Sequence, residues 1–486
     1  MGDDMGDQIL NFVAGEWQEG KGGRAIQIAN PAHSSEVLWE GSEASIADLD
    51  HAVGAAEVSF DLWRRSPAAK RAGVLNGAAD WLRTHADEVA ADLSREQGKT
   101  RLEAQGEVES TARSLQYFAG QAQEPIGDVL PRSETVGAIW AQRIPVGVVA
   151  CISPWNFPLL IPAYKLGAAI AFGNTVVLKP ALNTPHTAMY LVKAFEEAGC
   201  PAGAINLIVG SGTEVGQALV SEPRVAAISF TGSNEVGTSI AKSVAGSPVK
   251  VQLEMGGKNP ALVFEDADLD LAVDMTVKGA TGMAGQRCTA TSRVIAMDGI
   301  YADVERSISA RLKNLRLGDP LDLETDMGPL VSDHHRQDVL AHIERGKSSG
   351  RLTAGGEMGS GNELDNGYFV QPTLFSGVDP DSPLAQEEIF GPVISLIRAR
   401  SIEETIALAN RTRFGLSASV FTSNLGLAMD TIDALDVGVV HINGQSSALE
   451  RYVPFGGTKA SGHGGREQGR AAREFFTKWK SVYLNW

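Results

Sequence analysis

Cys288 is the residue of this chain best suited to covalent chemistry on a carbonyl group. It follows Gly285-Gln286, a turn-like lead that can expose a sulfur atom at the start of a helix. A cysteine thiolate is strongly nucleophilic and also leaves easily, so it can add to an aldehyde and later release the product. The other two cysteines fit ordinary roles, because Cys151 sits inside an apolar segment and Cys200 lies between a glycine and a proline.

Two further residues could complete that chemistry. Glu254 ends the apolar run Val251-Gln252-Leu253 and precedes a double glycine, which is an unusual setting for a solvated loop carboxylate. It is the candidate general base that activates water to hydrolyse a thioester. Asn156 lies in Pro154-Trp155-Asn156-Phe157-Pro158, where an asparagine is otherwise an ordinary turn residue. Its amide, together with the backbone N–H of Cys288, is the candidate donor to the oxyanion.

Length and composition limit the classes of protein. A chain of 486 residues is expected to form two or three domains. The 59 acidic and 42 basic residues give a net charge of −17, which argues against nucleic-acid and anionic-membrane partners. Three cysteines without zinc-site spacing predict no metal and a reducing compartment. The acidic N-terminus lacks the features of a signal peptide, so a cytoplasmic location is expected.

Apolar strand-like and helical segments alternate through the middle of the chain. This pattern predicts parallel strands joined by helical crossovers, as in a doubly wound nucleotide-binding sheet. The expected strands are 147–152, 175–179, 204–209 and 225–230, and the expected helices are 159–172, 187–198 and 213–221. A second α/β series begins after Glu254, with a strand at 260–264 and a helix at 269–281. Residues 478–486 alternate as a strand does.

The sequence contains no G-x-G-x-x-G fingerprint at the first strand–helix turn. Instead, Gly232 and Ser233 follow a strand and open a helix, where free N–H groups could bind a pyrophosphate. A simple helix cap beside a packing glycine is the alternative interpretation. Lys179 ends the 175–179 strand, at the sheet edge where such folds bind ligands, although a lysine there is more often a solvated surface charge.

Several sequence motifs, spread along nearly the whole chain, give it a resemblance to the aldehyde dehydrogenase superfamily. They are the Pro154–Pro158 word, Phe230-Thr231-Gly232-Ser233, Leu253-Glu254-Met255-Gly256-Gly257-Lys258, Glu387-Glu388-Ile389-Phe390-Gly391-Pro392 and Pro454-Phe455-Gly456-Gly457-Thr458-Lys459. The resemblance implies an α/β fold with a Rossmann-like doubly wound cofactor domain, an α/β catalytic domain and a β oligomerisation arm. The implied boundaries are 1–122 with 146–253 for the dinucleotide-binding domain, 254–460 for the catalytic domain, and 123–145 with 461–486 for the oligomerisation segment.

The same resemblance implies NAD(P)-dependent oxidation of an aldehyde to an acid, through a thiohemiacetal and a thioester on Cys288. Relatives that pass the acyl group to coenzyme A tend to lack the base, so Glu254 favours hydrolysis. The resemblance also implies a homodimer or homotetramer. In that assembly, residues 136–144 of a neighbouring subunit would cover the C-terminal strand.

The resemblance assigns cofactor roles residue by residue. Lys179 would reach the adenosine ribose, Glu388 would hold the nicotinamide ribose, and Phe390 would pack beside the nicotinamide. Leu182 stands where NAD-preferring relatives commonly carry a glutamate, so NADP should be tolerated as well as NAD. The remaining residues expected around the cofactor are Trp155, Gly232, Ser233, Gly212 and Gly216.

The substrate is the least determined part of the prediction. Arg287, beside the nucleophile, could hold a carboxylate or phosphate, or could turn away to pair with a surface acid. Phe455, Arg451 and Arg113 are further candidates. The words around Glu254 and Cys288 look most like bacterial 2-oxoglutarate-semialdehyde (2,5-dioxopentanoate) dehydrogenases, which favours a short semialdehyde acid.

Three kinds of alternative stay open: another aldehyde substrate, another enzyme class and a protein without enzymatic activity. The substrate could be succinate semialdehyde, glyceraldehyde 3-phosphate, or an aromatic or aliphatic aldehyde. A thiol esterase would use Cys288 and Asn156 without a dinucleotide. A binding protein on the same fold would need neither the cysteine nor the base.

Overall fold

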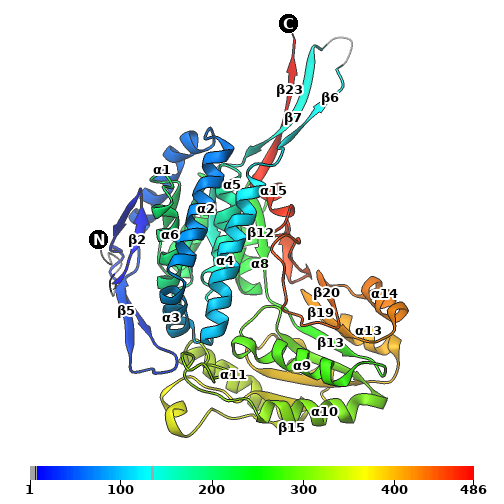
Figure 1. Ribbon diagram of the computed structural model, residues 1–486. Coiled ribbons are helices and arrows are strands. Elements are labelled where there is room, and N and C mark those ends of the chain that lie inside the picture. The colour runs from blue at the N-terminus through cyan, green and yellow to red at the C-terminus, as the bar shows by residue number, and fades with distance from the viewer. Residues whose placement is uncertain (1–5, 7, 133–135, 486) are drawn as a thin grey trace.

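The computed structural model describes residue 6 and residues 8–132 and 136–485. Residues 1–5, 7, 133–135 and 486 belong to the predicted terminal and arm segments and lie outside the described residues. Figure 1 shows two α/β bodies, each built on its own sheet, and a long β arm that projects from the first of them. The predicted α/β class with a doubly wound cofactor body is confirmed by this arrangement.

The first body contains an eight-stranded sheet with the order β22-β12-β11-β8-β9-β10-β2-β3. Its five central strands are parallel. The strands are β2 (Asn11–Val13), β3 (Glu16–Gln18), β8 (Val148–Ile152), β9 (Thr175–Lys179), β10 (Ile205–Leu207), β11 (Val225–Thr231), β12 (Lys250–Glu254) and β22 (Gly462–Gly464). A small sheet of β1 (Gln8–Ile9), β5 (Val37–Ser42) and β4 (Ala25–Ala29) lies beside it.

Helices bury both faces of this sheet, which explains why its central strands are apolar at successive positions. Val149 and Cys151 of β8 face one core, and Val148 and Ala150 face the other. The first core is shared with α2 (Ala68–Thr84), α3 (Ala86–Gln97), α4 (Arg101–Gln121), α5 (Leu160–Ala171) and α6 (Pro185–Glu197). The second is shared with α1 (Ile46–Trp63), α7 (Gln217–Ser221) and α8 (Asn234–Ser243).

The strand order reverses direction beside β8. From β8 the chain moves outward through β9 and β10, and it then returns to add β11 and β12 on the other side. Ligands of open α/β sheets bind at such a switch point, beyond the carboxyl ends of the strands. The loop that carries Asn156 follows β8, Gly232 follows β11, and Glu254 ends β12, so the topology brings all three to one edge.

The second body contains a seven-stranded sheet with the order β15-β16-β17-β14-β13-β19-β20. Its strands are β13 (Asn259–Val263), β14 (Thr291–Met297), β15 (Arg351–Ala354), β16 (Thr373–Ser376), β17 (Val393–Ala399), β19 (Ser417–Phe421) and β20 (Val439–Ile442). Its helices are α9 (Leu269–Thr281), α10 (Asp298–Lys313), α11 (Asp333–Gly346), α12 (Pro383–Gln386), α13 (Ile402–Asn410) and α14 (Leu425–Ala434). A two-stranded ribbon pairs β18 (Phe414–Gly415) with β21 (Thr458–Lys459).

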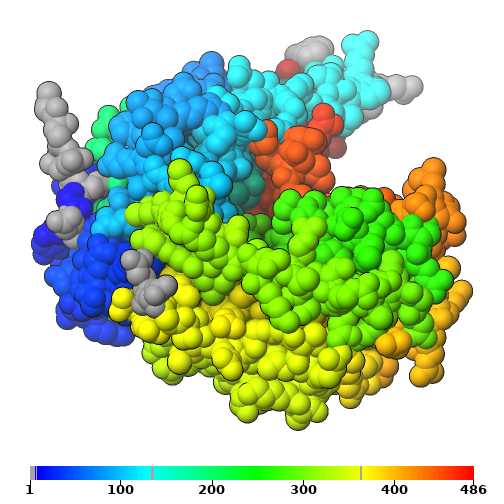
Figure 2. Space-filling model, turned by 60° about the horizontal axis from the view of Figure 1, so that its bottom comes forward, coloured from blue at the N-terminus to red at the C-terminus, as the bar shows by residue number. Residues whose placement is uncertain are grey.

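The two bodies touch directly, so a site between them has walls from both. In the space-filling view, the yellow residues of the second body lie against the blue residues of the first (Figure 2). Backbone hydrogen bonds cross this boundary from Tyr368 to Pro31 (2.9 Å) and from Arg101 to Pro320 (2.7 Å). Within the described ranges, no helix is long and apolar enough to cross a membrane.

The arm corrects one prediction about strand pairing. β23 (Thr477–Leu484) pairs antiparallel with β7 (Ala138–Pro145) of the same chain, and β7 also pairs with β6 (Gly127–Leu130). The expectation that a neighbouring subunit's 136–144 segment covers β23 is therefore wrong. Residues 462–476 lie on the first body, because β22 pairs with β12 and α15 (Ala471–Phe476) contacts α5.

Candidate active site

The chain before Cys288 adopts an unusual conformation. Met283, Ala284 and Gly285 have φ angles of 53°, 54° and 72°, a left-handed turn that non-glycine residues adopt at an energetic cost. Buried Gln286 fixes the turn: its Nε2 donates to the Met283 carbonyl (3.0 Å), and its Oε1 accepts from the Val331 N–H (2.9 Å). These contacts set where the chain delivers the nucleophile.

Asn156 contacts the nucleophile's loop directly. Its side chain is 3% exposed, and its Nδ2 donates to the carbonyl oxygen of Gln286 (3.0 Å). That bond leaves the second N–H of the amide available for an oxyanion. On the other side of the loop, Nδ2 of Asn259 donates to the carbonyl oxygen of Cys288 (2.8 Å). The cysteine is therefore held from both sides by side-chain amides.

Glu254 has the environment of a general base. It is 3% exposed, and its Oε2 has no hydrogen-bond partner in the part of the chain that the structure describes. Burial raises the pKa of Glu254 well above its usual range, and the nearby Glu467 carboxylate raises it further, whereas Lys165 and Arg466 lower it. A carboxylate with a raised pKa can accept a proton from water with a stronger driving force.

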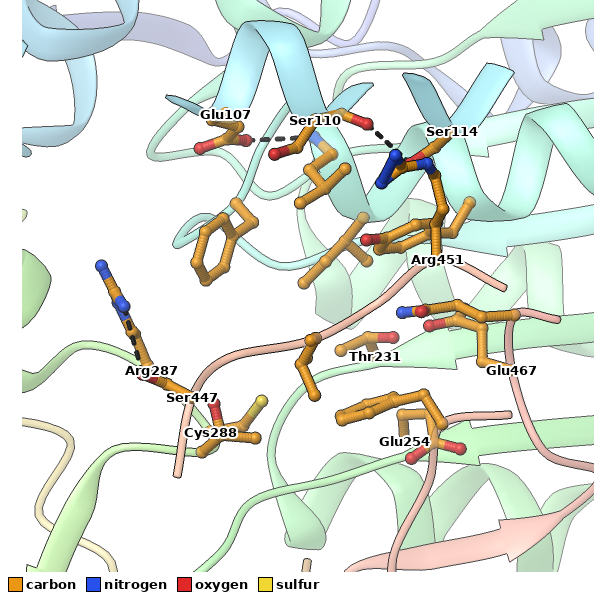
Figure 3. Close-up of a pocket in the computed structure, with 18 of the residues that line it drawn as sticks. Glu107, Ser110, Ser114, Thr231, Glu254, Arg287, Cys288, Ser447, Arg451 and Glu467 are labelled. Atoms are coloured by element: carbon orange, nitrogen blue, oxygen red, sulfur yellow. Dashed lines mark hydrogen bonds between the residues drawn. The ribbon is translucent and has the colours of Figure 1, made fainter. Parts of the chain in front are cut away.

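Two cavities meet at the Cys288 thiol, which lines both. The larger, of about 340 Å³, is drawn in Figure 3 and is lined by Glu254, Arg287 and Phe455 among others. The smaller, of about 230 Å³, is lined by Trp155, Glu388 and Phe390 among others. A carbonyl carbon bound to this sulfur would thus have one cavity for its own substituent and another for a second reactant.

Burial disfavours the charged thiolate form of Cys288. It raises the pKa of the thiol to about 12, and the Glu388 and Glu254 carboxylates contribute in the same direction. Attack on a carbonyl therefore requires a proton acceptor or a cation close to the sulfur. Glu254 is one of four carboxylates that line the same cavity, with Glu103, Glu107 and Glu467.

A carboxylate and an aromatic cluster line the smaller cavity. Oε1 of half-buried Glu388 accepts from the N–H of Gly257 (3.0 Å), and desolvation raises its pKa to about 7. Phe390 packs edge-on against Trp155 with ring centroids 5.3 Å apart, and its carbonyl accepts from Nε2 of His335 (2.9 Å). His335 also lines this cavity, although it belongs to none of the motifs that the sequence analysis identified.

The lysine at the end of β9 is buried rather than solvated, so its interpretation as a surface charge is wrong. Lys179 is 4% exposed and donates to the Pro180 carbonyl (3.0 Å), and burial lowers its pKa to about 8. Gly216 packs against its methylene groups, at the end of the one-turn π-helix Gly212–Gly216. The π-helix replaces the first part of the helix predicted over 213–221.

Gly232 and Ser233 lie between β11 and α8. Oγ of Ser233 caps α8 by accepting from the Val236 N–H (3.3 Å), and the Gly232 N–H donates to the Glu254 carbonyl (3.1 Å). Both residues line the smaller cavity. The helix-cap interpretation of Ser233 is therefore confirmed, and its place on the cavity wall is compatible with a cofactor role as well.

The candidate substrate residues divide into two groups. Arg287 lines the larger cavity, where its Nη2 lies 3.2 Å from Oε1 of Glu103 and its Nη1 donates to Oγ of Ser447 (3.3 Å). Arg451 and Phe455 line the same cavity. Arg113, by contrast, is exposed and pairs with Glu109 on the outer face of α4, so it is removed from the candidates.

The acidic residues of α4 that line the cavity were not predicted from the sequence. Glu103 and Glu107 stand one helical turn apart, which is the spacing of two residues on one helix face. That spacing is visible in the sequence, but it does not say that the face is turned toward Cys288. The buried Lys165–Glu467 ion pair (2.6 Å), near Glu254, was missed because its two members lie 302 positions apart in the sequence.

Comparison with known proteins gives a consistent result. The sequence model described as "Aldehyde dehydrogenase family" matches residues 17–482. "Alpha-ketoglutaric semialdehyde dehydrogenase" of Bacillus subtilis is 44% identical over 476 residues and covers 98% of both chains. "2,5-dioxopentanoate dehydrogenase" of Saccharolobus solfataricus is 39% identical and covers 98% of this chain and 99% of its own. A crystal structure of betaine aldehyde dehydrogenase from Staphylococcus aureus with NAD+ superimposes with a TM-score of 0.95 at 34% identity, covering 98% of this chain and 95% of that one.

Proposed function

This chain belongs to the aldehyde dehydrogenase family and oxidises an aldehyde with a nicotinamide cofactor, and we propose that its substrate is a short aldehyde that carries a carboxylate. The observation that supports this choice is the guanidinium of Arg287 in the cavity beside Cys288. Its contacts with Ser447 and Glu103 use two of the five N–H groups of the guanidinium, so terminal N–H groups remain for a substrate carboxylate. 2-Oxoglutarate semialdehyde is the leading candidate, because the relatives from Bacillus subtilis and Saccharolobus solfataricus are both named as dehydrogenases of this compound.

The proposed reaction follows from the arrangement of three side chains. The Cys288 thiolate adds to the aldehyde carbon, and the amide of Asn156 stabilises the resulting oxyanion. The bound cofactor accepts the hydride that the former aldehyde carbon loses, which leaves a thioester on the sulfur. Glu254 then takes a proton from water, and the hydroxide displaces the thiolate to give the acid.

The residues of the smaller cavity fit a nicotinamide cofactor. A carboxylate, an aromatic cluster and a helix N-terminus are the groups that bind ribose, nicotinamide and pyrophosphate. We assign these roles to Glu388, to Trp155 with Phe390, and to Gly232 with Ser233. A side chain at Gly256 would collide with the Glu388 carboxylate, which accounts for a glycine there. Lys179, Gly212 and Gly216 would bind the adenosine end. By this proposal, 1–122 with 146–253 bind the dinucleotide, and 254–460 supply the nucleophile.

Replacing Arg287 with glutamine tests the substrate class. We expect kcat/KM for 2-oxoglutarate semialdehyde to fall about tenfold to hundredfold, the value of one or two charge-assisted hydrogen bonds. The kcat/KM for propanal should change much less. Initial rates over a panel that adds succinate semialdehyde, glyceraldehyde 3-phosphate and benzaldehyde would measure the difference. Arg113→Gln, outside the cavity, is the matched control. An equal loss for all aldehydes would reject Arg287 as the carboxylate ligand.

We propose that NADP is used as well as NAD. Leu182 packs against the core of the first body and carries no charge that could repel a 2′-phosphate. Leu182→Glu should lower kcat/KM for NADP about tenfold or more and leave that for NAD within a factor of about three, because a carboxylate beside a phosphate is strongly unfavourable. Steady-state kinetics with both cofactors measures this. Negligible turnover of the unmodified protein with NADP would contradict the proposal.

We also propose that the arm joins two copies of the chain in a homodimer or homotetramer. β23 and β6 are the outer strands of the arm sheet, and Trp479 and Tyr483 of β23 and Val129 of β6 expose apolar surface. An exposed apolar edge strand is normally covered by a partner.

Free Cys151, Cys200 and Cys288 fit a reducing cytoplasm. A thiol esterase is the disfavoured alternative, because it would have no use for the second cavity.

A further inference from the structure

A buried ion pair lies at the start of α4, and the proposed reaction does not use it. Lys99 and Glu107 form this pair with side chains that are 0% and 1% exposed. Taking two charges out of water is costly, and the cost is recovered only when further hydrogen bonds satisfy both groups. The other contacts of this pair are therefore the place to look for its role.

Both members of the pair bind the backbone of the Asn156 loop. Nζ of Lys99 donates to the carbonyl oxygen of Asn156 (2.7 Å) and lies 4.6 Å from the centroid of the Phe157 ring. Oε1 of Glu107 accepts from the N–H groups of Leu159 and Leu160, at 3.0 Å each. The pair thus fixes both ends of a five-residue segment, 156–160, that carries the amide proposed to bind the oxyanion.

The same helix face binds the loop of the nucleophile. Oε1 of Glu103, one turn before Glu107, accepts from the N–H of Met283 (2.7 Å) and lies 3.2 Å from Nη2 of Arg287. Figure 3 shows Glu107 on the helix above the cavity, and Arg287 and Cys288 on the opposite wall. Neighbouring carboxylates of α4 therefore fix the two loops whose separation decides whether Asn156 can reach an oxyanion on Cys288.

We propose that Lys99 and Glu107 are positioning residues that hold the amide of Asn156 against the carbonyl oxygen of a substrate bound to Cys288, with Glu103 holding the facing loop. The inference rests on the proposed oxyanion role of Asn156. Stabilisation of an oxyanion depends on donors fixed within a few tenths of an ångström, because misplaced dipoles must reorganise during the reaction. A pair that binds a carbonyl and two N–H groups of one short loop supplies that fixation.

Lys99→Met tests the proposal. We expect kcat for the aldehyde to fall about tenfold or more, a large part of what one oxyanion donor contributes. The KM for the aldehyde, the affinity for NAD and the rate of Cys288 alkylation by iodoacetamide should stay within about threefold, because none of them needs the oxyanion. Glu109→Gln, a partly exposed acid on the outer face of the same helix, is the control and should leave all four quantities unchanged.

The decisive readout is a double-mutant cycle with Asn156→Ala. If Lys99 acts through Asn156, then Lys99→Met should change kcat less than about threefold once that amide is removed. An equal loss in both backgrounds would show a general structural role and overturn the proposal. If Lys99→Met fails to fold, Lys99→Met with Glu107→Gln removes both charges, keeps an oxygen acceptor for Leu159 and Leu160, and is tested in the same cycle. Full activity of Asn156→Ala alone would instead reject the proposed oxyanion role, before Lys99 enters the argument.

Discussion

We expect Cys288→Ser to abolish aldehyde oxidation, with kcat at least about a thousandfold lower than in the unmodified protein. A serine hydroxyl is far less acidic than a thiol, and the group activated at this position is already difficult to ionise. Burial raises the pKa of the Cys288 thiol to about 12. Replacing sulfur with oxygen therefore removes the nucleophile almost completely, although the side chain keeps nearly the same shape.

The variant should still bind the dinucleotide. The groups assigned to ribose and nicotinamide, Glu388 and Phe390, belong to other elements than the cysteine loop. Formation of reduced nicotinamide at 340 nm, a standard optical readout, measures the first effect, and NAD titration by fluorescence or calorimetry measures the second. Cys200→Ser, in a loop of the first body, is the matched control and should keep full activity. Substantial oxidation by Cys288→Ser would mean that the thiol is not the nucleophile.

The sequence predicted the parts of this site that depend on local pattern. Apolar runs bounded by turns predicted β8, β9 and β11, and the residues that follow parallel strands must gather at one edge of the sheet. Asn156, Gly232 and Glu254 could therefore be placed together before any coordinates were known. Covalent chemistry at Cys288 followed from the residue type and from the glycine turn before it.

The remainder depends on pairing between distant segments, for which the sequence has no local signal. The sequence offers Arg113 and Arg287 as equivalent candidates. Only the packing of the folded chain shows that Arg113 faces solvent and that Arg287 faces the cavity. His335 approaches Phe390 from a helix more than 50 positions earlier in the chain. The partner of β23 was assigned to the wrong subunit, because an alternating strand specifies that it pairs but not with what.

The buried charges around the site show the same limit. Helical periodicity predicts which residues of α4 share a face, and charged residues are normally assigned to the solvated face. Glu103 and Glu107 contradict that assignment, since both line the cavity. Their burial becomes understandable only when the backbone groups that they bind are known. Local rules of this kind are expected to fail at functional sites, where buried charge serves the chemistry.

Glu254→Gln should stop turnover after the first chemical half of the reaction. The amide cannot accept a proton from water, so hydrolysis of the thioester should slow by about a hundredfold to ten-thousandfold, the usual contribution of a general base. The first half transfers a hydride before water is needed. Rapid mixing should therefore reveal a burst of about one reduced nicotinamide per active site, followed by a slow steady rate. Glu57→Gln, on the exposed face of α1, is the control.

The pH dependence of kcat in the unmodified protein should also report on Glu254. Only the carboxylate form of Glu254 is a base, and burial raises its pKa well above the usual range. As the pH falls through that raised pKa, the ionised fraction falls, so kcat should decrease at a pH where an exposed glutamate would still be fully ionised. In Glu254→Gln the slow steady rate should lose this acid limb while the burst remains. If Glu254→Gln shows neither burst nor turnover, then Glu254 is needed earlier, to remove the proton of the Cys288 thiol. If the turnover of Glu254→Gln is unchanged, then another residue is the base that activates water.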